Sequence, residues 1–252
     1  MLLAVDIGNT NIVVGGMEGR EVLFTQRMPT DASLDGRDYA DAIASILYHH
    51  HAVAEGSIVS SVVPSVTEAV REGLHLITGQ APLVAGPRLH TGLPIHMDNV
   101  DKVGADRIVI AVAALERWQP PLILLDLGTA TTIEVVDRTG AYIGGCIIPG
   151  VRTAVDALSA RAAQLPPVEL TAPERVIGRN TVDCMQSGAM YGTAAMLDGM
   201  IDRMEAELGE GATIVATGGI APAIVPLCRR TMELEEDLML QGLRRLYEMN
   251  RN

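Results

Sequence analysis

The pattern of apolar and polar residues divides the chain into short buried strands and amphipathic helices, which is typical of an α/β protein. Residues 2–8 read Leu-Leu-Ala-Val-Asp-Ile-Gly, and residues 122–128 read Leu-Ile-Leu-Leu-Asp-Leu-Gly. Each segment is an apolar run that ends in Asp-x-Gly and is followed by polar residues and a second apolar run. Short continuous apolar runs are typical of buried strands. The repeat therefore predicts two duplicated α/β domains with a cleft between them.

The remaining periodicity predicts a series of helices and strands. Apolar residues at helical spacing predict helices over 38–50, 65–76, 103–118, 180–208, 221–228 and 234–247, and apolar runs predict strands over 57–63 and 212–216. Ser65 followed by Glu68 is a capping-box pattern. The Pro- and Gly-rich stretch 79–94 is expected to be irregular. Pro120-Pro121 stops a helix, so we expect domains 1–118 and 119–252, with the last helix free to pack back on the first.

Composition narrows the range of partners and compartments. With 19 Lys and Arg against 31 Asp and Glu, the net charge is −12, which disfavours nucleic acid and anionic membrane surfaces as partners. The N-terminus lacks a positively charged leader, and no apolar run is long enough to span a membrane. The three cysteines, Cys146, Cys184 and Cys228, are far apart without a CxxC pair. We therefore expect buried thiols in a reducing cytoplasm.

The chain contains a single lysine, Lys102. A GxxxxGK[ST] loop is therefore absent, which excludes the P-loop arrangement, and so is the strand lysine of protein kinases. Any phosphate site must rely on backbone N–H groups, small polar side chains, arginine and metal ions.

The turn Asp6-Ile7-Gly8-Asn9-Thr10-Asn11 is the first candidate site. An Asp at the carboxyl end of a buried strand faces the edge where α/β proteins place ligands. Gly8 lets a phosphate approach the backbone, and Thr10 and Asn11 add donors to the N–H groups of the turn. Asp6 then implies a cation, such as hydrated Mg²⁺. An ordinary turn is the alternative, which the second copy of the pattern disfavours.

That second copy, residues 126–132, carries Asp126, Gly128 and three threonines, including Thr129. It predicts a second phosphate-binding turn. Thr217-Gly218-Gly219 follows a predicted strand, and its glycines would let a flat group such as adenine lie against the backbone. Taken alone, this segment fits a plain strand-to-helix turn equally well.

Gly104-Ala105-Asp106-Arg107 is the strongest catalytic candidate. It lies at the predicted start of an apolar helix, where backbone N–H groups point outward. A carboxylate beside a guanidinium offers a proton acceptor and an anion-binding fork. The alternative is a surface Asp that only stabilises the helix N-terminus.

Two other features have ordinary explanations. Consecutive helical residues point about 100° apart, so His49-His50-His51 cannot all bind one metal ion, and a solvated helix end is expected. The segment 185–204 interleaves methionines with Gly and Ala. Core packing is the default interpretation there, and an oligomer interface competes with it.

The ordered motifs resemble those of the type III pantothenate kinases, within the acetate kinase/sugar kinase/Hsp70/actin superfamily. The resemblance covers essentially the whole chain and rests on the following segments: DIGNTN at 6–11, GADR at 104–107, DLGTATT at 126–132, GGCIIPG at 144–150, IGRNTVDCMQSG at 177–188 and ATGG at 216–219.

The resemblance implies two ribonuclease H-like, actin-like ATPase domains and ATP-dependent phosphorylation of pantothenate, the first step of coenzyme A synthesis. It implies a homodimer with the substrate site at the interface, Asp106 as the base, Asp6 near Mg²⁺, and Asp126 as the ligand of a monovalent cation, K⁺ or NH₄⁺. ATP would be bound by Asp6, Ile7, Gly8, Asn9, Thr10, Asn11, Ile12, Val13 and Thr129. Pantothenate would be bound by Gly104, Ala105, Asp106, Arg107, Thr181 and Met97.

The chain departs from the family pattern in one loop that borders the substrate, where Met97 and Val100 replace the usual Tyr and Pro. Two alternative functions stay open. One is another small-molecule kinase of the superfamily, which would leave Gly104–Arg107 unexplained. The other is a nucleotide-binding accessory regulator without turnover, which the intact Asp6, Asp106 and Asp126 disfavour.

Overall fold

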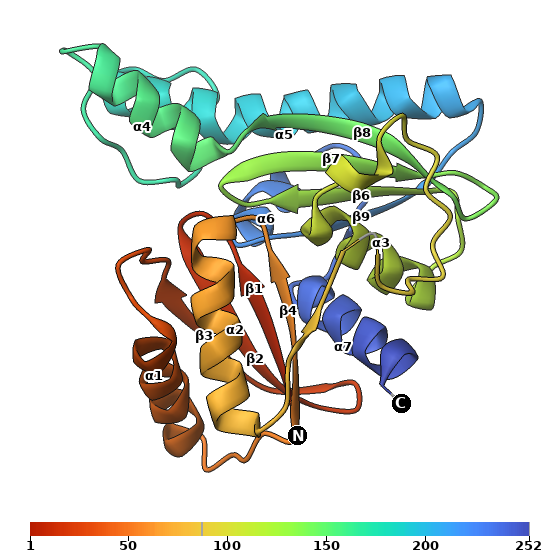
Figure 1. Cartoon of the computed structure of the whole chain (residues 1–252). Coiled ribbons are helices and arrows are strands. Elements are labelled where there is room, and N and C mark those ends of the chain that lie inside the picture. The colour runs from red at the N-terminus through yellow and green to blue at the C-terminus, as the bar shows by residue number, and fades with distance from the viewer. Residues whose placement is uncertain (87, 252) are drawn as a thin grey trace. The chain divides into compact units, whose positions relative to one another are not determined.

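The computed structural model describes residues 1–86 and 88–251 (Figure 1). Contacts between residues divide the chain into two compact units, each with its own sheet. The first unit comprises Met1–Leu93, Met97–Arg117 and Asp237–Asn252, and the second comprises Pro94–His96 and Trp118–Glu236. The polypeptide therefore passes between the units more than once, and the last helix belongs to the first unit.

The sheet of the first unit has β1 at its centre. Its strands are β1 (Leu2–Ile7), β2 (Asn11–Glu18), β3 (Glu21–Pro29), β4 (Gly56–Ser61) and β5 (Leu83–Val84), in the order β3-β2-β1-β4-β5. β1 pairs antiparallel with β2 and parallel with β4. Because β1 and β4 run the same way, their carboxyl ends share one edge of the sheet.

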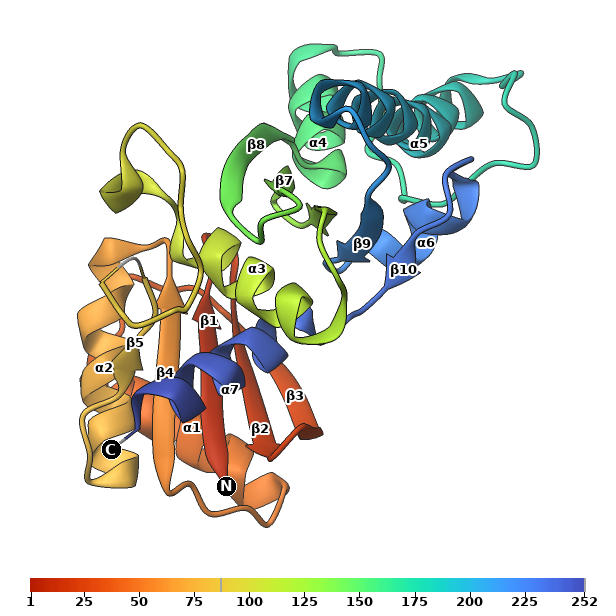
Figure 2. The same ribbon diagram turned by 90° about the vertical axis from the view of Figure 1, so that its right-hand side faces the viewer.

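Helices cover both faces of this sheet (Figure 2). On one face, α1 (Gly36–His49) and α2 (Pro64–Thr78) bury a core around Leu3, Val5 and Ile7. On the other face lie α3 (Ala105–Arg117), which follows the 3-10 turn η1 (Val100–Lys102), and α7 (Leu238–Asn250). A Cβ at Gly242 of α7 would collide with the backbone of α3, so the glycine permits close packing of these two helices.

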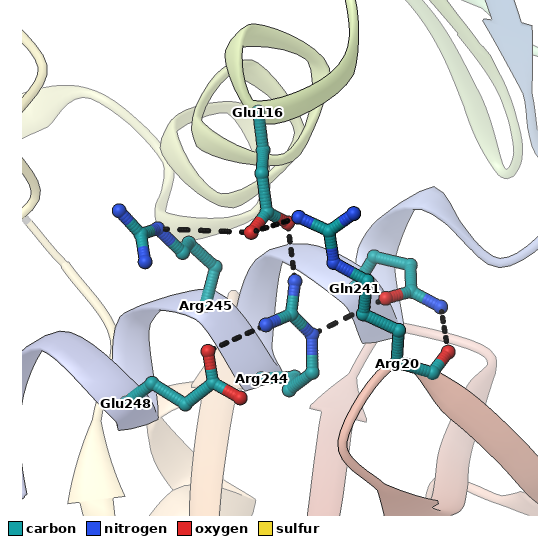
Figure 3. Close-up of polar contacts among 6 residues, drawn as sticks. All are labelled: Arg20, Glu116, Gln241, Arg244, Arg245 and Glu248. Atoms are coloured by element: carbon teal, nitrogen blue, oxygen red, sulfur yellow. Dashed lines mark hydrogen bonds and ion pairs between the residues drawn. The ribbon is translucent and has the colours of Figure 1, made fainter.

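A buried arginine links α7 to α3 through polar contacts (Figure 3). Arg244 is 3% exposed. Its guanidinium donates to Glu116 of α3, to Glu248 at 2.5 Å and to Gln241 at 3.3 Å. Glu116 also accepts from Arg20, at 2.9 Å. Every nitrogen of the Arg244 guanidinium thus has an acceptor, which a buried charge requires.

The second unit repeats the topology of the first. Its strands are β6 (Leu122–Leu127), β7 (Ala130–Val136), β8 (Tyr142–Pro149), β9 (Thr213–Thr217) and β10 (Glu233–Leu234), in the order β10-β9-β6-β7-β8. The central strand β6 pairs antiparallel with β7 and parallel with β9. These are the relations that β1 has to β2 and β4. The predicted duplicated α/β fold is confirmed.

The long helix α5 (Thr181–Leu208) covers the sheet of the second unit and shares its core with α6 (Ala221–Ile224). The helix α4 (Val151–Arg161) follows β8 directly and packs beside α5. Asn180 caps α5, because its side chain accepts a hydrogen bond from the N–H of Asp183 at 2.9 Å.

Several predicted helices need correction. The capping box at Ser65 is wrong, because α2 begins at Pro64, whose fixed φ suits the first helical position. The predicted helix 221–228 ends at Ile224 and continues as the 3-10 turn η2 (Val225–Leu227). Pro226 lacks the N–H that a continuing α-helix needs. The last helix begins at Leu238 rather than at 234, because β10 occupies 233–234.

The expectation of buried thiols is wrong for Cys184, which is exposed on α5, whereas Cys146 and Cys228 are partly buried. Burial, with Asp198 nearby, raises the pKa of the Cys228 thiol to about 11.

Residues 49–51 are exposed, as predicted for a solvated helix end. Within residues 1–86 and 88–251, none of the helices combines the length and apolar character needed to cross a membrane.

Candidate active site

The first predicted turn lies at the carboxyl end of β1. Asp6 is half-buried at the second-to-last position of this strand. The N–H of Gly8 donates to the carbonyl of Asn11 at 3.0 Å, and Thr30, which directly follows β3, donates its hydroxyl to the carbonyl of Gly8 at 2.6 Å. Asn9 to Asn11 are exposed. The turn therefore presents a fixed backbone and exposed polar side chains to solvent.

The segment Gly104–Arg107 lies in the same unit, at the start of α3. A Cβ at Gly104 would displace the carboxylate of Asp106 from its position, so glycine leaves room for this side chain. One Asp106 oxygen accepts the N–H of Arg107 at 2.9 Å. Burial raises the pKa of Asp106, and the N–H and charge of Arg107 oppose part of that rise. A carboxylate with a raised pKa is a stronger base, as proton abstraction requires.

Met97 is half-exposed and follows a short segment that pairs with the edge of the second sheet. Ile95 forms an isolated bridge to Tyr142, in which the N–H of Tyr142 donates to Pro94 at 2.8 Å and the N–H of His96 donates to Tyr142 at 2.8 Å. The loop that carries Met97 is therefore anchored at its start.

In the second unit, Asp126 occupies on β6 the place that Asp6 has on β1, and it is also half-buried. The turn 217–219 lies against it. Gly218 has a φ of +97°, and a Cβ there would come within 2.6 Å of both the Asp126 carboxylate and the N–H nitrogen of Leu127. The structure thus brings Asp126 and the Thr-Gly-Gly turn together.

Thr129 is held by the junction between β8 and α4, a support that the sequence analysis missed. Its carbonyl accepts the N–H of Gly150 at 3.1 Å and the hydroxyl of Thr153 at 2.8 Å. A Cβ at Gly150 would collide with the carbonyl oxygens of Gly128 and Thr129. The only sequence signal for this contact is Gly150 itself, the last residue of the segment 144–150.

Thr181 is the first residue of α5 and is exposed. It lines a hollow of about 780 Å³ between α4 and α5. The walls include Val155 and Leu158 of α4 and the small residues Gly188 and Gly192 of α5. Thr181 therefore opens onto a largely apolar hollow of the second unit, whereas Asp106 belongs to the first unit.

The aspartates at the ends of the central strands would need further ligands to hold a metal ion. Within the described part of the chain, no cluster of three or more His, Cys or acidic side chains could hold a metal ion alone. Asp6 and Asp126 are single carboxylates at strand ends, which suit an ion that keeps several waters and binds phosphate oxygens.

Two units of identical strand order, each with an aspartate near the end of its central strand, define the two-domain α/β fold of the class that includes the sugar kinases. A ROK family glucokinase from Streptomyces griseus, in complex with glucose and AMPPNP, has this fold. It superposes with a TM-score of 0.52 at 14% identity over 98% of each chain. A Campylobacter jejuni protein assigned to the Baf family of transcriptional activators gives 0.63 at 16% identity over 98% of each chain.

Within this class, the chain belongs to the type III pantothenate kinase family. The family model for type III pantothenate kinase matches residues 2–203. The type III pantothenate kinase of Moorella thermoacetica is 45% identical to this chain over an alignment of 254 positions. The alignment covers 99% of this chain and 100% of the relative. Kinases of this family use ATP with a divalent metal ion.

Proposed function

We propose that this protein transfers the γ-phosphoryl group of ATP to the hydroxyl of pantothenate, the first step of coenzyme A synthesis. The observation that supports this most is the partly buried Asp106–Arg107 pair at the start of α3 in a member of the type III pantothenate kinase family. Asp106 accepts the alcohol proton late in the transfer, and Arg107 binds the carboxylate at the far end of pantothenate.

The two turns would hold ATP. The backbone and polar side chains of residues 6–13 and Thr129 bind its phosphates, since the chain has no P-loop lysine. Asp6 would hold Mg²⁺ near the phosphates, where the ion would neutralise charge on the phosphate oxygens. Asp126 binds a monovalent cation, K⁺ or NH₄⁺. Phosphoryl transfer depends chiefly on such alignment and charge neutralisation.

Thr181 and Met97 complete the substrate site in this proposal. Thr181 lies at the end of an apolar hollow beside Leu158, which is 47% exposed, and Val182, which is 41% exposed. Exposed apolar side chains beside small residues favour close packing against another surface. A second copy of the chain would cover this hollow, and its Thr181 would then reach the pantothenate of the first copy.

An ATP-consumption assay tests the activity. The purified protein is supplied with ATP, Mg²⁺ and K⁺, and pantothenate is compared with a panel of sugars and acetate. We expect turnover with pantothenate alone, and a loss of activity when Na⁺ replaces K⁺ and NH₄⁺. Turnover with a sugar or acetate would indicate a different small-molecule kinase, and no turnover at all would favour a nucleotide-binding regulator.

A further inference from the structure

Ser60 on β4 carries a buried hydroxyl that the fold does not use. Its side chain is 0% exposed, and its Oγ has no hydrogen-bond partner among the residues that the structure describes. A buried hydroxyl without a partner costs free energy, and such groups are rare in folded proteins. The hydroxyl is therefore available to a partner that is acquired in another state of the molecule.

The register of the sheet places Ser60 beside Asp6. The two residues are direct partners in the parallel pair β1–β4. Residues two apart on a strand share a face, so Ser60 lies on the same face as Gly56, where a Cβ would collide with Tyr247 of α7. This is the face covered by α7 and by α3, whose first turn carries Asp106. Ser60 and Asp6 thus lie side by side toward the candidate active site.

The second unit repeats this arrangement. Asp126 on β6 pairs with Thr217 on β9, and Thr217 is 3% exposed. In both units, the aspartate near the end of the central strand therefore has a buried hydroxyl residue as its partner on the parallel neighbour. The sequence alone does not reveal this correspondence, because the similar segments 57–61 (Ser-Ile-Val-Ser-Ser) and 213–217 (Thr-Ile-Val-Ala-Thr) would align Ser60 with Ala216, one residue away from the structural register.

We propose that Ser60 is a positioning residue for Asp6. When ATP and Mg²⁺ bind, the Ser60 hydroxyl donates a hydrogen bond to the Asp6 carboxylate and fixes its orientation toward the water ligands of the metal ion. Strand partners are about 5 Å apart, so rotation of the two side chains is enough to bring the oxygens together. Hydrogen bonds to metal-associated carboxylates are typically worth 10- to 100-fold in affinity or activity. The inference rests on the proposed nucleotide site at Asp6.

Ser57 provides a matched control on the same strand. It is 3% exposed, and its Oγ likewise has no hydrogen-bond partner within the described residues. It pairs with Leu3 and faces the core beneath α1 and α2, away from Asp6. Ser57→Ala and Ser60→Ala therefore remove the same unsatisfied group from opposite faces of β4.

Calorimetric titration with ATP and Mg²⁺ distinguishes the two positions. We expect Ser60→Ala to weaken binding about 10-fold or more, Ser57→Ala to bind like wild type, and Ser60→Thr, which keeps a hydroxyl, to retain most of the affinity. Both alanine variants should unfold at the wild-type temperature or up to about 4 °C higher. If Ser60→Ala fails to fold, Ser60→Cys, which keeps the volume with a weaker donor, takes its place with the same expectation.

Unchanged binding in Ser60→Ala overturns the proposal, and so does an equal loss in Ser57→Ala. If wild-type protein binds no ATP with Mg²⁺, the proposed function and this inference both fail. If it binds ATP with Mg²⁺ but does not phosphorylate pantothenate, only the proposed substrate fails, because the binding measurement still tests Ser60.

Discussion

Asp106 is held in a partly buried position that costs the folded protein stability in return for basicity. Its pKa is raised by burial above the usual 3.8. The folded state therefore binds the Asp106 proton more tightly than the unfolded state does, and ionisation of this group destabilises the fold. Stabilisation of the helix start alone does not account for a carboxylate whose ionisation destabilises the fold.

We expect Asp106→Asn to lower turnover about 10²- to 10⁴-fold, the usual contribution of a general base, with little change in pantothenate binding. Steady-state kinetics and calorimetric titration with pantothenate measure the two effects. The stability advantage of the variant should grow as the pH rises from 3.8 and level off above the raised pKa. Wild-type turnover in the variant would remove Asp106 from the mechanism.

At Gly218, Asp126 and the backbone of Leu127 leave no room for a side chain. Gly140, where a side chain has room, serves as the control. Both have positive φ, +97° and +82°, but a Cβ at Gly140 would meet nothing within 4 Å. Both alanine variants carry backbone strain of about 1 kcal/mol or more. Only Gly218→Ala should also displace Asp126 and abolish activity. Denaturant unfolding and turnover of the two variants test this, and an active, stable Gly218→Ala protein would contradict it.

At the scale of elements, the sequence predicts the strands and helices whose pattern is strong. The buried strands β1, β4, β6 and β9 and the helices α1, α3 and α5 form within a few residues of the predicted limits. The strands that were missed are β3, β5, β8 and β10, and the missed helix is α4. β8 and β3 are edge or solvent-facing strands with mixed burial, so their apolar pattern is weak. α4 begins at Val151, and its N-cap residue, Gly150, has no side chain to cap the helix.

The residues of the candidate site can likewise be predicted only where they lie in an element with a strong sequence pattern. Asp6, Asp106 and Asp126 can be proposed from sequence, because each lies near the end or the start of an element with a clear pattern. The contacts of Ser60 with β1 and of Gly150 with Thr129 depend on pairing between segments that are far apart in the chain. No local pattern encodes such pairing, so these supporting residues become visible only in the folded structure.

We expect the ion pair between Glu116 of α3 and Arg244 of α7 to contribute to the free energy of unfolding. Glu116→Gln removes the charge that faces the buried Arg244, and it should lower the free energy of unfolding by about 1.5–3 kcal/mol. Glu68→Gln removes one partner of the exposed pair with Arg71 and should cost less than about 1 kcal/mol. Urea unfolding measures both. Equal losses would show that burial of Arg244 adds nothing to the contact.

At the scale of the whole molecule, the proposed dimer predicts that two inactive proteins can restore each other. Asp106→Asn removes the base, and Thr181→Trp blocks the substrate in the partner's site. Mixed dimers contain one site with both wild-type residues. We therefore expect activity to return after subunit exchange, up to about one quarter of the wild-type value for random pairing and one intact site in each mixed dimer. Exchange is verified by native mass spectrometry, and exchange without recovery would contradict a shared site.

The placement of α7 has a consequence for how the chain folds while it is being made. Residues 118–236 leave the ribosome before the helix that completes the first unit has been synthesised. The sheet face beneath α7, which receives Leu240, stays uncovered throughout that time. The second unit can therefore close first, although it is encoded later, and the nascent first unit presents an apolar surface to ribosome-associated chaperones until the final helix emerges.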